Sequence, residues 1–177
     1  MGKRSSFERR ERDFYPTPRE AVAPLIPHLQ YGDMFIEPCA GDGALVRALE
    51  HYGMSCVEAT DIQPAASDIR QFDALDEDLD LVAEGAVWII TNPPWSRDLL
   101  HPMIRHFSRI CPTWLLFDAD WMHTRQSAEF LPLLRKVVSV GRVKWIPDSK
   151  MTGKDNCCWY LFDAHQSGPV EFIGRAA

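Results

Sequence analysis

Four consecutive residues, Asn92-Pro93-Pro94-Trp95, follow an apolar run that is typical of a buried strand. The two prolines stiffen the backbone, so that the Asn92 side-chain oxygen and the Pro93 carbonyl oxygen face outward at the strand end. Two such acceptors suit the two protons of a planar NH2 group, and Trp95 can stack on the ring that carries the amine. The tetrapeptide is therefore the predicted catalytic motif, with a plain strand terminator and a core tryptophan as the alternative.

A second motif is the turn Glu37-Pro38-Cys39-Ala40-Gly41-Asp42-Gly43, which joins a short apolar run to a helical segment. Its glycines allow a tight turn and a close approach of the backbone to a ligand. Val46 replaces the third glycine of a dinucleotide-binding fingerprint, so the match to a pyrophosphate loop is incomplete. A nucleoside site and a plain tight turn both remain compatible with this motif.

Two carboxylates follow the turn at positions that suit a nucleoside. Asp61 stands 20 positions after Gly41, at the predicted end of the next strand, where it can accept hydrogen bonds from both ribose hydroxyls. NAD and S-adenosylmethionine fit this arrangement equally well. Phe72-Asp73-Ala74-Leu75 is predicted to close the pocket, with Asp73 accepting from an adenine amino group. A capping role for Asp61 and a surface role for Asp73 are the alternatives.

The elements that must position these residues are short apolar runs that alternate with helix-period segments. This repetition predicts an α/β fold with a Rossmann-like, doubly wound, mostly parallel sheet of seven strands. Strands are predicted at residues 34–37, 55–61, 69–72, 87–91, 114–118, 137–146 and 157–163, and helices at residues 43–52, 97–110 and 123–135. A polar stretch without a helix joins the last two strands and predicts a terminal antiparallel pair. Another helix is expected to begin at Pro18 and to be shortened by Pro24 and Pro27.

The charge distribution limits the kinds of partner that the chain can bind. The 177 residues carry a formal net charge of -6, which excludes binding to nucleic acid by bulk positive charge. Residues 73–84 contain six acidic and no basic residues, whereas residues 97–154 contain ten Lys and Arg against five Asp and Glu. An acidic protein with one positive face is compatible with this pattern.

Cysteine usage and hydropathy predict a cytoplasmic protein. The five cysteines are an odd number without CxxC spacing, so we expect reduced thiols and neither disulfides nor a metal site. No apolar run reaches 18 residues, and the charged N-terminus does not have the pattern of a signal peptide. Neither a membrane partner nor a secreted location is therefore expected.

With these motifs the chain resembles the class I S-adenosylmethionine-dependent amino methyltransferases, in particular the short DNA adenine methyltransferases of phages and prophages. The resemblance covers roughly residues 14–163, and Phe14-Tyr15-Pro16-Thr17-Pro18 is similar to the family's N-terminal motif. It implies S-adenosylmethionine as cofactor, DNA as partner, catalysis by residues 92–95, and a bacterial or phage-infected cytoplasm. The cofactor-binding residues that it implies are Tyr15, Thr17, Glu37, Pro38, Ala40, Gly41, Gly43, Asp61, Ile62, Asp73, Ala74 and Asn92.

The chain departs from that family because it has no room for a separate target-recognition domain. Residues 1–13 are expected to form a basic, mobile head and residues 14–177 a single methyltransferase domain. A homodimer or a partner subunit would then contribute to target recognition. A base flipped out of a duplex also needs aromatic and cationic contacts. The candidates are Trp95, Arg97, Trp121, Lys150 and Lys154, with core packing as the alternative for Trp121.

The leading hypothesis from the sequence is methylation of the N6 amine of adenine in DNA. Methylation of cytosine N4, of an RNA adenine or of a protein glutamine amide are alternatives, because the same motif serves all of these amines. A nicotinamide-dependent oxidoreductase would use Asp61 but leaves residues 92–95 unexplained. The alternative from another class is a non-catalytic module on the same fold that binds nucleic acid or a partner.

Overall fold

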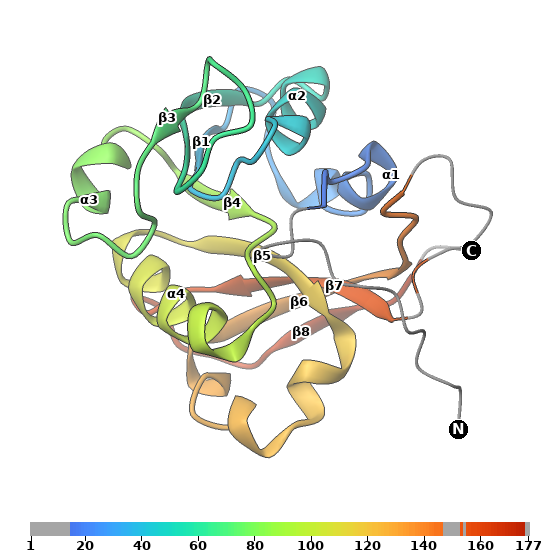
Figure 1. The fold of residues 1–177 in the computed structure, drawn as a ribbon. Helices are drawn as coiled ribbons and strands as arrows, with labels where there is room; N and C mark the ends of the chain where they lie inside the picture. The colour runs from blue at the N-terminus through green and yellow to red at the C-terminus, as the bar shows by residue number, and fades with distance from the viewer. Residues whose placement is uncertain (1–14, 147–152, 154, 176–177) are drawn as a thin grey trace.

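The structure is a computed structural model, and it describes residues 15–146, 153 and 155–175. One eight-stranded sheet runs through it in the order β3-β2-β1-β4-β5-β7-β6-β8 (Figure 1). The strands are β1 (Met34–Glu37), β2 (Ser55–Asp61), β3 (Arg70–Gln71), β4 (Trp88–Thr91), β5 (Thr113–Asp118), β6 (Leu134–Arg142), β7 (Asn156–Phe162) and β8 (Glu171–Ile173). The predicted basic head and the predicted contacts Lys150 and Lys154 lie outside the described residues.

The strand pairing confirms the doubly wound, mostly parallel sheet. β1 pairs in parallel with β2 on one side and with β4 on the other, so the strand order reverses at β1. β2 pairs in parallel with β3, and β4 with β5. β7 runs antiparallel to both β5 and β6, which confirms the predicted antiparallel pairing of the last two long strands.

The prediction of seven strands is wrong by one, because β8 extends the sheet beyond β6. It pairs with β6 in parallel, and Lys136 Nζ of β6 lies 2.8 Å from Glu171 Oε2 of β8. A strand of three residues, with Phe172 64% exposed, leaves no alternating apolar pattern to detect.

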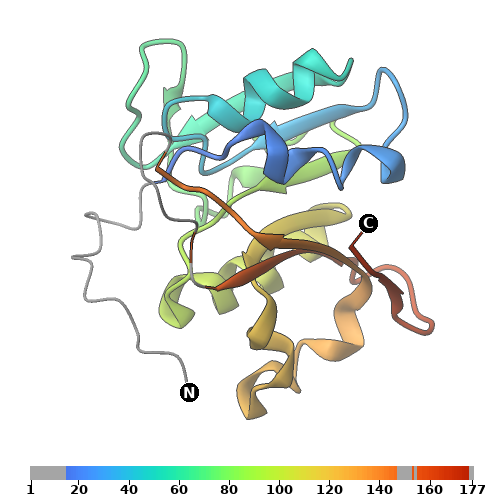
Figure 2. The same ribbon diagram turned by 90° about the vertical axis from the view of Figure 1, so that its right-hand side faces the viewer.

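Helices cover both faces of the sheet (Figures 1 and 2). They are α1 (Arg19–Val22), α2 (Ala44–His51), α3 (Leu79–Val82) and α4 (Arg97–Ile110), with 3-10 helices at Ile26–His28, Ala119–His123, Arg125–Ser127 and Leu131–Leu133. On one face α1 and α2 pack against a core that includes Leu49 and Trp159. On the other face α4 packs against a core that includes Phe117 and Tyr160. Two covered faces explain the continuous apolar runs of the central strands.

The apolar spacing of α4 explains its position. Leu100, Met103, Ile104 and Phe107 are buried on one side of the helix, at the spacing of an amphipathic helix. The predicted helix at residues 97–110 is confirmed at both ends, and only Ser96 separates it from the Asn-Pro-Pro-Trp motif. Within the described ranges, no helix is long and apolar enough to cross a lipid bilayer.

The predicted helix at residues 123–135 is wrong. Three 3-10 helices occupy most of this region, and β6 already begins at Leu134. Thr124 has an extended backbone with φ -83° and ψ 150°, and Pro132 lacks the N–H group that an α-helix needs. The predicted strand at residues 137–146 is also misplaced, because β6 spans Leu134–Arg142. Gly141 has a φ of 85°, outside the range of an extended strand, and β6 ends one residue later.

Candidate active site

A cavity of about 490 Å3 lies at the carboxyl ends of β1, β2 and β4, where the strand order reverses. Ligands of open α/β sheets bind at such a point, and small-molecule sites have volumes of about 300–1,000 Å3. The predicted site residues that line the cavity are Tyr15, Thr17, Glu37, Pro38, Ala40, Gly41, Asp61, Ile62, Asp73, Ala74, Asn92 and Pro94. The structure therefore brings the N-terminal motif, the glycine turn and the Asn-Pro-Pro-Trp motif together around one volume.

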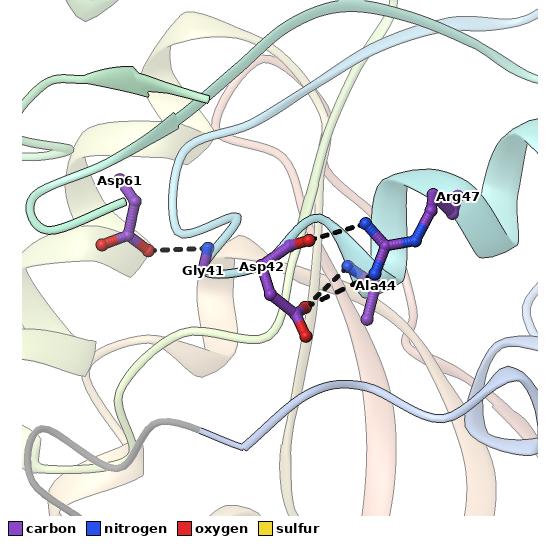
Figure 3. A network of polar contacts seen from close by, with 5 residues as sticks. All are labelled: Gly41, Asp42, Ala44, Arg47 and Asp61. Atoms are coloured by element: carbon purple, nitrogen blue, oxygen red, sulfur yellow. Dashed lines mark hydrogen bonds and ion pairs between the residues drawn. The ribbon is translucent and has the colours of Figure 1, made fainter. Parts of the chain in front are cut away.

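The glycine turn has a backbone geometry that favours glycine. Gly41 and Gly43 have φ angles of 57° and 77°, in the left-handed region. Asp42 Oδ1 accepts from the Ala44 N–H at 2.9 Å, and Arg47 Nη1 donates to the Asp42 carbonyl oxygen at 2.6 Å (Figure 3). Gly43 is the N-cap of α2 and does not itself line the cavity. These contacts fix the turn against the start of α2.

Asp61 fixes the same turn from the end of β2. Its Oδ2 accepts from the Gly41 N–H at 2.8 Å (Figure 3), and its Oδ1 accepts from the Gln63 N–H at 2.8 Å. A carboxylate oxygen can accept two hydrogen bonds, so each oxygen keeps one lone pair for a ligand. Asp73 accepts from the Leu75 N–H at 2.9 Å through Oδ1, and within the described part of the chain its other oxygen stays open to a ligand. Both acids can therefore hold their loops and accept from a ligand.

Glu37 places a buried carboxyl group at the floor of the cavity, where β1 ends. It is 2% exposed, and its Oε2 has no hydrogen-bond partner among the described residues. Burial, followed by the negative charges of Asp61 and Asp42, raises the pKa of Glu37 well above its usual range. A ligand that brings a positive charge would relieve both effects.

The side chain of Asn92 lies just beyond the end of β4 and joins two motifs. Trp95 Nε1 donates to Asn92 Oδ1 at 3.2 Å, and Asn92 Nδ2 donates to Thr17 Oγ1 at 3.2 Å. Because an indole nitrogen can only donate, its bond identifies which amide atom of Asn92 is the oxygen. That oxygen keeps a second lone pair, which can accept from an amine.

Trp145 lies against the motif, although it is distant from it in the sequence. Its ring centroid is 5.8 Å from that of Trp95 at an interplanar angle of 81°, and 6.4 Å from that of Tyr15 at 54°. Contacts therefore run from Thr17 through Asn92, Trp95 and Trp145 to Tyr15. Sequence reasoning missed Trp145, because a tryptophan near the end of a predicted strand has no feature that separates it from a core residue.

Two other predicted acceptor contacts lie outside the cavity lining. Arg97 is exposed at the start of α4. Trp121 is 4% exposed and belongs to the core on the α4 face, where its Nε1 donates to His101 Nε2 at 3.1 Å. This position corresponds to the core-packing alternative for Trp121. Pro93 and Trp95 of the predicted catalytic motif also lie outside the lining.

Several lining residues were absent from the sequence predictions. Leu99 and Met103 reach the cavity from α4, and a helix that begins beside the predicted catalytic motif was the available signal for them. Gln63 and Pro64 follow Asp61 directly and belong to the same loop. Their positions depend on how this loop folds over the cavity, which residue types do not specify.

The cavity offers positioned hydrogen-bond acceptors. Among the residues that the structure describes, no group of three or more His, Cys, Asp and Glu side chains is arranged to hold a metal ion. Cys39 lines the cavity, and burial raises the pKa of its thiol, so the reactive thiolate is disfavoured. What the lining can do is orient a nucleoside through Asp61 and an amine through Asn92.

Comparisons with known proteins define the fold. No family model and no curated protein matches the sequence, whereas solved structures do match. A type I restriction-modification methyltransferase subunit from Streptococcus thermophilus has a TM-score of 0.57 and 11% identity, over 90% of this chain and 47% of that chain. A Listeria monocytogenes protein assigned to the class I S-adenosylmethionine-dependent methyltransferases has a TM-score of 0.55 and 11% identity, over 90% and 63%. A Pyrococcus horikoshii protein assigned as an RNA methyltransferase has a TM-score of 0.54 and 16% identity, over 84% and 86%.

The chain therefore has the fold of the class I S-adenosylmethionine-dependent methyltransferases. It spans about half of the Streptococcus chain and less than two thirds of the Listeria chain. At these identities the likeness concerns the fold, and the chemistry has to be argued from the site.

Proposed function

We propose that this chain is an S-adenosylmethionine-dependent methyltransferase that modifies an exocyclic amino group, the N6 amine of adenine in DNA. The observation that carries the proposal is the position of Asn92. It lines the cavity while bonded to Thr17 on one side and to Trp95 on the other. An amine held by Asn92 would therefore meet a methyl donor held in the cavity.

S-Adenosylmethionine fits the groups that line the cavity. Asp61 offers acceptors for the ribose hydroxyls, and Asp73 offers one for the adenine amino group. The unpartnered, buried Oε2 of Glu37 suits a cofactor that carries positive charge. When bound, the cofactor supplies an electrophilic methyl group on a cationic sulfur.

The contribution of the protein to the reaction is alignment. An exocyclic amine of adenine is a weak nucleophile, because its lone pair is delocalised into the ring. Asn92 Oδ1 and the Pro93 carbonyl oxygen would accept its two protons, which favours a pyramidal nitrogen with a localised lone pair. Orientation of this kind contributes about 7–11 kcal/mol in favourable cases. The proton released by the methylated nitrogen passes to solvent.

The preference for adenine in DNA rests on the motif and on its aromatic surroundings. Trp95 is bonded to Asn92 and packs against Trp145, and aromatic rings favour a planar base. The Streptococcus structure of the same fold is a restriction-modification subunit. Target recognition would come from a second copy of the chain or from a partner subunit.

The deciding experiment is incubation with labelled S-adenosylmethionine and separate DNA, RNA and protein acceptors, followed by mass spectrometry of the hydrolysed products. N6-methyladenine in DNA, absent with the Asn92→Ala variant, is the expected result. Label in N4-methylcytosine, RNA or a glutamine amide would reassign the acceptor and keep the chemistry. Cofactor binding without transfer to any acceptor would favour a non-catalytic module.

A further inference from the structure

The segment Arg142-Val143-Lys144-Trp145-Ile146 leaves the end of β6 beside the acceptor side of the site. Trp145 reaches the ring of Trp95 at 5.8 Å between centroids, and Trp95 bonds to Asn92 at 3.2 Å. One side chain therefore separates this segment from the amide that is proposed to hold the amine.

The side chains of the segment alternate between two environments. Val143 is 4% exposed and Trp145 is half-buried, whereas Arg142 and Lys144 are exposed. Alternate residues of an extended chain point to opposite sides, so the two cations face away from the core that Val143 joins. Neither cation forms an ion pair with any residue in the described ranges.

The backbone of the segment is held in place across the hairpin. The Gly153 N–H donates to the Val143 carbonyl oxygen at 2.8 Å. A Cβ atom at Gly153 would lie 2.8 Å from that oxygen and 3.2 Å from Trp145 Cδ1. Glycine is therefore needed at position 153 because Val143 and Trp145 approach it closely.

We propose that residues 142–146 bind the nucleic-acid strand that carries the target base. Trp145 would contact a base next to the acceptor site, and Arg142 and Lys144 would bind phosphates. Residues two apart in an extended chain are separated by about 6.6 Å, a spacing that suits successive phosphates of a strand. A chain with a net charge of -6 needs such a local cluster to attract a polyanion. The inference rests on the proposed function, since it assigns the partner of the same site.

The test measures binding of the full chain to a fluorescently labelled single-stranded oligonucleotide of mixed sequence, by anisotropy over a range of salt concentrations. In the Arg142→Ala/Lys144→Ala variant, the slope of log K against log salt should become shallower by about 0.7 for each phosphate that the protein no longer neutralises. Trp145→Ala should lower affinity about tenfold at every salt concentration without changing the slope, because it removes stacking and no charge. Trp145→Phe keeps an aromatic ring and should retain most of the affinity. The loss in Trp145→Ala can then be assigned to the missing ring and not to misfolding.

The control is Arg109→Ala, which removes one exposed cation from the last turn of α4, whereas the double variant removes two. Arg109 lies twelve residues beyond Arg97 on α4, or about 18 Å along the helix, and its replacement should leave the slope unchanged. An unchanged slope in the double variant, or an equal change in Arg109→Ala, would overturn the proposal. If the slopes overturn this binding site but the wild-type chain still methylates DNA, the proposed function stands. If the slopes change as expected but no nucleic acid is methylated, the binding site stands and the proposed function falls.

Discussion

The indole N–H of Trp95 donates to the side-chain oxygen of Asn92 at 3.2 Å. The same amide donates through its nitrogen to Thr17 Oγ1, so both ends of the Asn92 side chain are held. An amide fixed in this way keeps its remaining oxygen lone pair in one direction, which favours alignment of a bound amine. We therefore propose that Trp95 positions Asn92, in addition to offering an aromatic face.

Replacement of Trp95 by Phe tests this positioning role, because Phe keeps an aromatic face and loses the N–H donor. A typical hydrogen bond contributes about 0.5–1.5 kcal/mol, so we expect kcat for methyl transfer to fall roughly 2- to 12-fold. Trp95→Ala should reduce transfer further, because it also removes the ring. Steady-state kinetics with a saturating acceptor measures both effects.

Trp88, at the start of β4, provides a matched control. Trp88 Nε1 donates to Asp33 Oδ2 at 2.8 Å, at the start of β4 and away from the cavity lining. Trp88→Phe removes an equivalent indole donor and should leave kcat unchanged. Equal losses in Trp88→Phe and Trp95→Phe would indicate a general effect on stability and would contradict a specific role for Trp95.

Removal of the Asn92 amide should separate catalysis from cofactor binding. We expect Asn92→Ala to lower kcat about 100-fold or more, the scale of losing one positioned polar group in an active site. The affinity for S-adenosylmethionine, measured by calorimetry, should change little, because Asn92 is assigned mainly to the acceptor. A variant that no longer binds the cofactor would assign Asn92 to the cofactor site.

Local motifs predicted many of the residues that line the cavity, because the sheet brings together the ends of neighbouring strands. Glu37, Asp61 and Asn92 each end or follow a strand, and parallel pairing of β2, β1 and β4 places those ends side by side. Trp145 was not predictable in the same way. It follows β6, on the far side of β5 and β7 from β1, and its position depends on the close approach of Gly153.

The errors in the fold prediction have two causes, one local and one tertiary. Around Thr124 and Pro132 the apolar spacing favours a helix, but extended backbone and a missing N–H donor produce 3-10 helices. β8 is held by pairing with β6 and by the ion pair of Lys136 with Glu171. Neither interaction leaves a pattern in three residues.

Asp61→Asn should weaken cofactor binding while the chain stays folded. The substituted amide retains one oxygen, but its NH2 group faces a backbone N–H at either Gly41 or Gln63. Loss of a charge-assisted hydrogen bond typically costs about 1.5–3 kcal/mol, so affinity for S-adenosylmethionine should fall roughly 10- to 150-fold. The exposed Asp68→Asn variant is the control, and equal affinities of wild type and Asp61→Asn would remove Asp61 from the site.

The raised pKa of Glu37 predicts that the free energy of unfolding depends on pH, and it fixes the direction of that dependence. The unfolded state loses the Glu37 proton near pH 4.5, whereas burial keeps the proton on the folded state to higher pH. Within that window the folded state binds more protons, so the Glu37 contribution makes the free energy of unfolding fall as pH rises. Glu37→Gln cannot titrate, and its stability relative to wild type should therefore increase from pH 4.5 upward.

Urea denaturation of Glu37→Gln and wild type across this pH range measures the difference. Glu50→Gln, which removes an exposed carboxyl from α2, is the control. A difference between Glu37→Gln and wild type that stays constant with pH would contradict the raised pKa.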